Sequence, residues 1–329
     1  MIPFLLRRVV QSIPTLFLAS LLIFFIIQLA PGDFLTPAKL NPNISPEQIA
    51  NLERNFGLDR HPIEQYFLWM KNMLFNFDFG LSFMYQQPAL DVMKPRIVNS
   101  LWLVLLTTVF FYAISIPLGV YGAVRQNSLA DKSVNVVLYF LLGFPSFFLA
   151  LIVIFGILEL KRITGGRIDL PFGGMTSAGF NDLSQFRQVL DILSHLLIPA
   201  LVLAISDAAG LTRVIRGQML EVMRADYIRT ARAKGVSENT AIWKHTFRNA
   251  ILPIVAGIGS LLPAAISGAG LLEVVFGYPG ITPMILEALG AQDLYLIAGF
   301  TVIGTVLLIL GNALSDILLA VVDPRIKVG

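Results

Sequence analysis

The stretch RADYIRTARAKGVSENT, residues 224–240, combines four basic side chains with a single glycine inside a chain that is otherwise mostly apolar. Basic side chains at a membrane surface bind anionic lipid, at about 1 kcal/mol for each residue. Lipid binding alone does not require a glycine between two helix-compatible segments. The pattern therefore indicates a folded structure in addition to any contact with lipid.

A helix, a tight turn and a second helix are predicted around Gly235. Residues 211–234 contain no proline and strong helix formers, so we expect a helix to continue from the fourth apolar run into the aqueous phase or along the membrane surface. Gly235 suits the left-handed position after a helix end, and Ser237 suits the N-cap of a helix over residues 238–249. The charged stretch is therefore expected to form a rigid knob on the inner face of a membrane.

Three polar side chains lie in or at the end of long apolar runs. Asp207 and Asp316 are functional candidates because acids within a membrane are costly and are usually retained for a purpose. Asp207 also lies six residues before Arg213, and Asp316 lies close to the end of its run, so a paired or interfacial position is the alternative for both. Asn312, one turn before Asp316, is more typical of a hydrogen bond between helices than of a selectivity element.

Small residues and a proline mark the fifth apolar run, residues 249–272. Small side chains spaced four apart let helices approach closely in lipid, and a proline interrupts the ladder of backbone hydrogen bonds. Close packing and a role in a transport path are both open for this run. The candidate positions are Ser260, Pro263, Ala264, Ser267 and Gly268.

The sequence argues against several kinds of enzyme site. It contains no G-x4-G-K-[ST] phosphate-binding loop, so ATP hydrolysis would have to come from another subunit. The three histidines, His61, His195 and His245, are far apart, no H-E-x-x-H motif is present, and there is no cysteine to supply a thiolate ligand. We therefore expect no catalytic residue, cofactor or metal site in this chain.

Composition indicates a membrane protein, because 56% of the 329 residues are hydrophobic, 14% are charged and the mean hydropathy is +0.74. Six runs of at least 21 residues carry at most one charge each. About 20 helical residues cross the hydrocarbon core of a bilayer, so the sequence predicts an all-α membrane protein with six transmembrane helices. The runs are 9–32, 97–124, 133–158, 192–212, 249–272 and 294–315.

The basic residues predict the orientation of these helices. With the N-terminus inside, the inner loops and the termini hold 14 of the 24 Lys and Arg residues, and such an excess is typical of the cytoplasmic side. Both termini and the loop 213–249 are therefore expected in the cytoplasm. The first run exceeds the length of a signal-peptide core, so we expect it to remain as a span. Positive charge confined to one membrane face does not indicate a nucleic-acid partner.

The loop between the first two spans is expected outside and partly helical. The segment SPEQIANLERNFG has the residues expected of a capped helix. Ser45 suits the N-cap and Gln48 can complete a capping box with it, while Pro46 suits the first helical position and Gly57 the end of the helix. A second helix is expected to open at Pro62, and the aromatic residues that follow it suit the lipid headgroup layer.

Five blocks of sequence resemble the B-type permease of dipeptide and oligopeptide importers of the ATP-binding-cassette (ABC) class. DYIRTARAKGVSENTAIWKHTFRNAILPIV is similar to the cytoplasmic EAA loop of these permeases, in the form found in the peptide and nickel permease family. The other blocks are LRRVVQSIPTLFLASLLIFFIIQLAPGD, FGLDRHPIEQYFLWM with FGLS, VFGYPGI and DPRIK. The blocks follow the family's order and extend along nearly the whole chain.

The resemblance implies a type I ABC importer transmembrane domain over residues 96–329. Residues 1–95 would add the first span and an external loop with amphipathic helices. It also implies that the EAA loop forms a coupling helix in a groove of a separate ATPase, and that the fifth span lines the substrate path. This chain departs from the general pattern, because Arg229 stands where the acidic residue is expected and Asp226 is the nearest acid. The implied coupling residues are Asp226, Tyr227, Arg229, Ala231, Lys234, Gly235 and Ser237.

The resulting prediction is a permease subunit of a bacterial inner membrane, without enzyme activity of its own. With a second, homologous permease it would form a path for di- or oligopeptides. Two ABC ATPases using ATP and Mg, an external substrate-binding protein and membrane lipid are the implied partners. Nickel or another small solute stays open as the substrate, and a secondary transporter or channel is the alternative class. A secondary transporter is expected to show internal repeats, and none is found.

Overall fold

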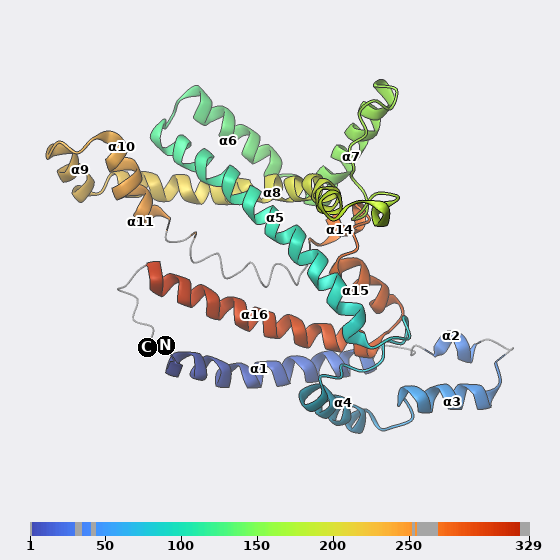
Figure 1. Cartoon of the computed structure of the whole chain (residues 1–329). Coiled ribbons are helices and arrows are strands. Elements are labelled where there is room, and N and C mark those ends of the chain that lie inside the picture. The colour runs from blue at the N-terminus through green and yellow to red at the C-terminus, as the bar shows by residue number, and fades with distance from the viewer. Residues whose placement is uncertain (1, 30–34, 41–43, 252–253, 255–268, 323–329) are drawn as a thin grey trace.

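The computed structural model is mostly helical in the parts of the chain that it describes (Figure 1). These parts are residues 2–29, 35–40, 44–251, 254 and 269–322. Within them no β-strand is formed. The all-α prediction is therefore confirmed for the described residues.

Most of these helices coincide with apolar runs or with the capped segments of the loops. On the N-terminal side they are α1 (Ile2–Gln28), α2 (Thr36–Lys39), α3 (Pro46–Phe56), α4 (Pro62–Asn76), α5 (Ala89–Val124), α6 (Leu129–Leu142) and α7 (Ser146–Ile163). They continue with η1 (Phe180–Asp182), α8 (Gln185–Met223), α9 (Asp226–Ala233), α10 (Glu238–Thr240), η2 (Ala241–Phe247), α11 (Arg248–Ala250), α14 (Leu271–Val275), α15 (Ile281–Gly290) and α16 (Leu294–Val322).

Among the described residues, four helices are long and apolar enough to cross a membrane, namely α1, α5, α8 and α16. They contain the second, fourth and sixth predicted spans and residues 9–28 of the first. Helix α5 has 36 residues and α8 has 39, so both are much longer than a hydrocarbon core requires. The prediction that the fourth span continues beyond the membrane fits the unbroken course of α8 to Met223.

The third predicted span, residues 133–158, is not one straight helix. It is split between α6 and α7, which meet at 103°. The break falls at Gly143, Phe144 and Pro145. Glycine destabilises a helix, and proline lacks an N–H and disfavours helical geometry at the residue before it. Counted together, α6 and α7 could supply a fifth span.

The fifth predicted span, residues 249–272, is described only near its two ends, in α11 and α14. Its predicted path or packing residues lie outside the described part of the chain. They are Ser260, Pro263, Ala264, Ser267 and Gly268. The structure therefore does not test them.

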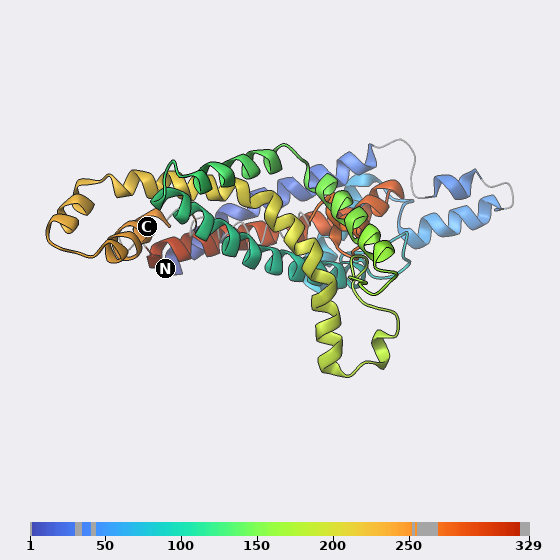
Figure 2. The same cartoon turned by 90° about the horizontal axis from the view of Figure 1, so that it is seen from above.

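The long helices run between two ends of an elongated molecule (Figures 1 and 2). Helix α1 begins, and α5, α8 and α16 end, on the side where α9 and α10 lie. Helices α2 and α3 lie at the opposite end. The most extensive packing joins α5 to α8, and the next joins α1 to α16. Helix α8 bends along its length (Figure 2) and contains Pro199, a residue that kinks helices.

Small residues bring α5 and α8 close together. A Cβ at Gly119 would lie 2.7 Å from the Cβ of Ile215 and 3.0 Å from the backbone oxygen of Thr212. One turn earlier, the Ser115 hydroxyl donates a hydrogen bond to the Ala208 carbonyl oxygen at 3.4 Å. Such contacts stabilise helix pairs in lipid, where no hydrophobic effect drives helices together.

The loop between α1 and α5 forms the predicted helices. Ser45 and Gln48 make both hydrogen bonds of a capping box, and Gly57 ends α3 in the left-handed conformation at φ 67°. Helix α4 begins at Pro62, as predicted. Its Tyr66 and Trp69 pack with Phe24 of α1 in one apolar cluster. These contacts fix the loop against α1 and α16.

Candidate coupling surface

Residues 224–250 form a compact, charged projection at one end of the molecule, which we call the charged knob (Figures 1 and 2). It contains α9, α10, η2 and α11. Two residues separate its first helix from the end of α8. The knob is thus a direct extension of the longest helix in the described chain.

The turn of the knob has the predicted geometry. Gly235 adopts φ 83°. Its N–H donates to the Arg232 carbonyl oxygen at 3.0 Å, and the Val236 N–H donates to the Ala231 carbonyl oxygen at 3.2 Å. This pair of bonds defines a Schellman motif. The Ser237 hydroxyl then accepts the Thr240 N–H at 3.4 Å as the N-cap of α10.

The second arm of the knob covers the predicted residues 238–249 but is not α-helical throughout. Its central part, η2, is a π-helix, between the short α10 and α11. The Thr246 hydroxyl is buried and donates to the Ala241 carbonyl oxygen at 3.0 Å, five residues earlier. Single π-helical turns inside longer helices are frequent at functional sites.

Two side-chain contacts that the sequence pattern does not reveal brace the knob. Arg232 of α9 forms an ion pair with Glu238 of α10, at 2.6 Å between Nη2 and Oε1. The Asn249 amide donates to the Tyr227 hydroxyl at 2.8 Å, which joins the first and last helices. The sequence contained one signal for the ion pair: a basic residue, Arg232, before Gly235 and an acidic residue, Glu238, after it.

An apolar core fixes the knob to the helix bundle. Ile228 of α9 is fully buried. Ile242 and Ala250 belong to one cluster with Ile215 and Met219 of α8, and this cluster also includes α5 side chains. A displacement of the knob is therefore expected to displace the end of α8.

The outer surface of the knob carries most of the predicted coupling residues. The side chains of Asp226 and Arg229 are 98% and 75% exposed and lie 3.6 Å apart. Tyr227, Lys234 and Ser237 are also exposed. Ala231 is half-buried. These side chains form a charged surface without a covering element among the described residues.

The chain shares its sequence with a large family of transport proteins. The profile described as "Binding-protein-dependent transport system inner membrane component" matches residues 115–328. A profile for the N-terminal part of such components matches residues 1–105. The chain belongs to this family.

Curated members of the family match this permease over almost their full length. The oligopeptide transport system permease protein AppB of Bacillus subtilis is 36% identical over 99% of this chain and 100% of its own. A putative peptide permease protein of Brucella ovis is 36% identical over 100% of both chains. The oligopeptide transport system permease protein OppB of Haemophilus influenzae is 32% identical over 99% of this chain.

The three predicted intramembrane polar residues of the permease lie on two helices, α8 and α16. Asp207 on α8 and Asn312 on α16 are exposed in the single chain, and Asp316 is half-buried. Arg213 does not pair with Asp207, because its guanidinium lies over the ring of Tyr139, 4.9 Å from the centroid.

A buried acid organises the VFGYPGI block of the permease, and its role was not apparent from the sequence. Glu273 is fully buried on α14. It accepts hydrogen bonds from the Ser100 hydroxyl of α5 at 2.6 Å and from the Thr282 N–H at 2.8 Å. The Ser100 oxygen in turn accepts the Ile281 N–H at 2.9 Å. The block is therefore fastened to the second predicted span.

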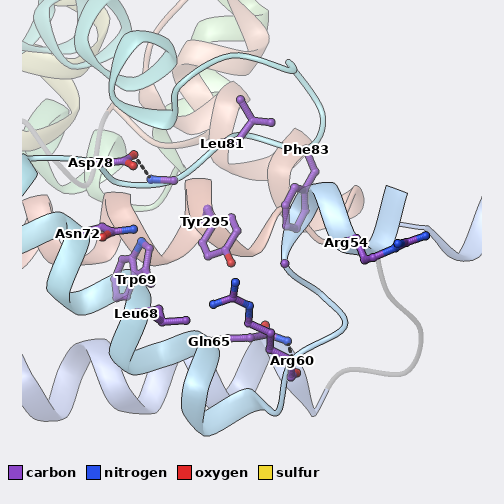
Figure 3. Close-up of a pocket in the computed structure, with 12 residues that line it drawn as sticks. Arg54, Arg60, Gln65, Leu68, Trp69, Asn72, Asp78, Leu81, Phe83 and Tyr295 are labelled. Carbon is purple, nitrogen blue, oxygen red and sulfur yellow. Dashed lines mark hydrogen bonds between the residues drawn. The ribbon is translucent and has the colours of Figure 1, made fainter. Parts of the chain in front are cut away.

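At the opposite end from the charged knob, a cavity of about 270 Å³ lies between α3, α4 and the start of α16. In Figure 3, the Tyr295 hydroxyl and the Arg60 guanidinium point toward each other across it, and Arg54 points away. Two of its lining groups already have partners: the Trp69 indole donates to Phe79, and Asp78 accepts the Gly80 N–H. We interpret this cavity as part of the packing of the loop.

Proposed function

We propose that this chain is the permease subunit of an ATP-driven importer of di- or oligopeptides, and that the charged knob is the surface on which a separate ATPase docks. The observation that carries the proposal is the knob itself, an exposed helix–turn–helix anchored to α5 and α8 by an apolar core. The names of the relatives, which are peptide or oligopeptide permeases, support the substrate class.

The proposed assembly contains a second, homologous permease, two ABC ATPases that use ATP and Mg, and an external substrate-binding protein. The lack of a phosphate-binding loop in this sequence supports the division of labour. Large apolar side chains exposed on α5, α6 and α7 support contacts with lipid and with the second permease. Examples are Trp102, Val109, Phe140 and Phe155.

The proposed topology has six spans in a bacterial inner membrane, with both termini and the charged knob in the cytoplasm. It is supported by the position of the start of α1 and the end of α16 on the side of the knob (Figure 1). The excess of basic residues in the same loops agrees with this orientation. Helices α2 to α4 are then external.

The proposed path runs beside the fifth span and its small residues, and it is completed by the second permease. Asp207 and Asn312 expose polar groups within apolar helices. Such groups are costly in contact with lipid. Burial against the second permease, or against water in the path, would satisfy them.

Thiol labelling tests the topology cleanly, because the chain has no cysteine. Cysteines at Gln48 and Asn181 are expected to react with an impermeant reagent added to sealed cells. A cysteine at Glu238 is expected to react only after the membrane is opened. Reaction of position 238 from outside would reverse the orientation and remove the knob from any cytoplasmic ATPase.

Reconstitution tests the function. Proteoliposomes that contain this chain with its permease and ATPase partners are expected to accumulate labelled peptide only with ATP and the loaded binding protein. The chain alone is expected not to hydrolyse ATP. Peptide accumulation driven by an ion gradient without ATP would instead identify a secondary transporter.

A further inference from the structure

Two arginines of α8 reach across to α6 shortly before the charged knob begins. Arg216 donates from Nε and Nη2 to the two carboxyl oxygens of Asp131, at 2.9 and 2.8 Å. Arg213 places its guanidinium 4.9 Å from the ring centroid of Tyr139. We call these two contacts the α6–α8 strap. Residues 213 and 216 lie three apart, and residues 131 and 139 lie eight apart, so each pair shares one helix face.

The ion pair of the strap is enclosed. The side chain of Asp131 is 3% exposed and that of Arg216 is 25% exposed. Asp131 also accepts the Asn127 N–H at 2.9 Å and the Asn135 amide at 2.8 Å. A Cβ at Gly122 of α5 would lie 3.0 Å from Asp131 Oδ1 and 3.2 Å from Arg216 Cδ. Helix α5 therefore closes over the pair.

This enclosure makes the strap difficult to open. Separating the two side chains would leave a carboxylate with little access to water, and uncompensated buried charge strongly destabilises a protein. A bidentate guanidinium–carboxylate pair also fixes the relative orientation of its partners. The ends of α6 and α8 are therefore expected to stay together when either helix is displaced.

The position of the strap connects two distant features of the fold. Arg216 lies seven residues before the end of α8 at Met223, a helical distance of about 10 Å. On the other helix, α6 leads from Asp131 to the 103° bend before α7. A displacement of the knob along α8 can thus reach the α6–α7 bend through the strap.

We propose that the α6–α8 strap makes α6 move as one body with α8 when the ATPase acts on the charged knob. Asp131, Tyr139, Arg213 and Arg216 are then positioning residues for transport. The α6–α7 bend receives the movement that starts at the knob. This inference rests on the proposed function of the knob.

A distance measurement tests the strap directly. Val137 on α6 and Val214 on α8 are exposed, so both can carry spin labels after substitution by cysteine. In the complete complex, with cysteine-free partners, the distance between the labels is expected to be narrow and equal in the nucleotide-free and ATP-trapped states. With Asp131→Asn added, the distribution is expected to broaden or to change between the states.

Transport efficiency supplies the second readout. Substitutions in networks that couple two sites change the coupling about 2- to 30-fold. Asp131→Asn should therefore lower the amount of peptide imported per ATP hydrolysed by a factor in this range. Tyr139→Leu should lower it as well without endangering folding, because Tyr139 is 57% exposed. The neutral pair Asp131→Asn with Arg216→Gln should recover part of the loss. Lys132→Gln, which removes an exposed charge beside Asp131, is the matched control.

The outcomes distinguish failure of the strap proposal from failure of the proposed function of the charged knob. If the wild-type complex is driven by ATP but the label distance shifts with nucleotide, the strap proposal is wrong and the charged knob stands. The same conclusion follows if Asp131→Asn and Tyr139→Leu keep the ratio of peptide to ATP found for Lys132→Gln. If the wild-type chain fails to assemble with an ATPase, the proposed function is wrong and the strap proposal falls with it.

Discussion

Arg232 and Glu238 form a bidentate ion pair across the turn of the charged knob, with Nε–Oε2 at 3.0 Å and Nη2–Oε1 at 2.6 Å. Arg232 lies before Gly235 in the Schellman motif, and Glu238 is the first residue of α10. Side chains thus reinforce an angle that the backbone of the turn already sets. Because both residues are partly exposed, the pair contributes about 0.2–1 kcal/mol to stability. Its main consequence is therefore the orientation of the two helices.

Neutralising this pair is expected to impair coupling more than stability. Arg232→Gln and Glu238→Gln should leave the amount of subunit in the membrane unchanged, because an exposed pair stabilises the fold only slightly. ATPase activity stimulated by the loaded binding protein should fall in both variants. Lys161→Gln, which removes an exposed ion pair with Asp169 outside the knob, is the control. Stimulation equal to that of the control in both variants would mean that the pair does not orient the knob.

Gly235 is expected to discriminate between substitutions by backbone conformation alone. Its φ is 83°, and no described atom outside its neighbours lies within 4 Å of a Cβ built there. Steric overlap is therefore excluded as the cause of any loss on substitution of Gly235. The left-handed conformation itself costs a residue with a Cβ about 1 kcal/mol or more. Asparagine tolerates this conformation better than a β-branched residue does.

We therefore expect the Gly235→Asn variant to retain most transport and the Gly235→Val variant to lose it. Both variant proteins are expected in the membrane in normal amounts. Gly217→Ala is the control, because Gly217 lies inside α8 and has space around it among the described residues. The measurement is peptide uptake normalised to subunit in the membrane. Full uptake by Gly235→Val would show that the angle of the turn does not matter for docking.

Local features of this fold could be predicted because their causes lie within a few residues. The capping box at Ser45 and the left-handed Gly235 depend on neighbours in sequence, and both are confirmed. Three of the six apolar runs lie within single long helices for the same reason, and α1 covers residues 9–28 of the first run. The break at Gly143 and Pro145 was also a local signal, but the apolar character of residues 133–158 concealed it.

Tertiary pairs could not be predicted in this way. Arg216 and Asp131 are 85 residues apart, and Ser100 and Glu273 are 173 residues apart. In the sequence, each of these residues is an ordinary charged or hydroxyl-bearing residue near the end of an apolar run, and nothing identifies its partner. Only the packing of α5, α6, α8 and α14 brings the partners together. For Asp207, the sequence suggested Arg213 as a partner, whereas in the structure the Arg213 guanidinium lies over the ring of Tyr139.

The contact between α5 and α8 is expected to be sensitive to side-chain volume at Gly119. A Cβ there would meet Ile215 at 2.7 Å and the Thr212 backbone oxygen at 3.0 Å, and a backbone atom cannot rotate away. Gly119→Val should destabilise the subunit by about 1–3 kcal/mol, as overpacking does elsewhere. Thermal unfolding of the purified complex measures the loss. Gly210→Ala, with open space among the described residues, should melt at the wild-type temperature or slightly above it.

Glu273 provides the last test, because its carboxyl group is surrounded by donors. It accepts from the Ser100 hydroxyl, from the Thr282 N–H and, at 3.3 Å, from the Ala269 N–H. A Cβ at Gly280 would overlap this carboxyl group, so there is no room for it to turn away. Glu273→Gln replaces one acceptor oxygen with an NH₂ that faces donors. It should destabilise the subunit by about 2–3 kcal/mol through lost charge-assisted hydrogen bonds.

Ser100→Ala should cost less, about 1–2 kcal/mol, because it removes one hydrogen bond and leaves the Ile281 N–H without its acceptor. The double variant should be less destabilised than the sum of the two single variants, since both act on one network. Glu287→Gln is the control: its side chain is exposed and keeps an oxygen for the Tyr85 hydroxyl. The measurement is thermal unfolding of the four variant complexes, each compared with the wild type. Additive effects, or a Glu273→Gln complex that melts with the Glu287→Gln control, would mean that the buried acid does not hold the VFGYPGI block against α5.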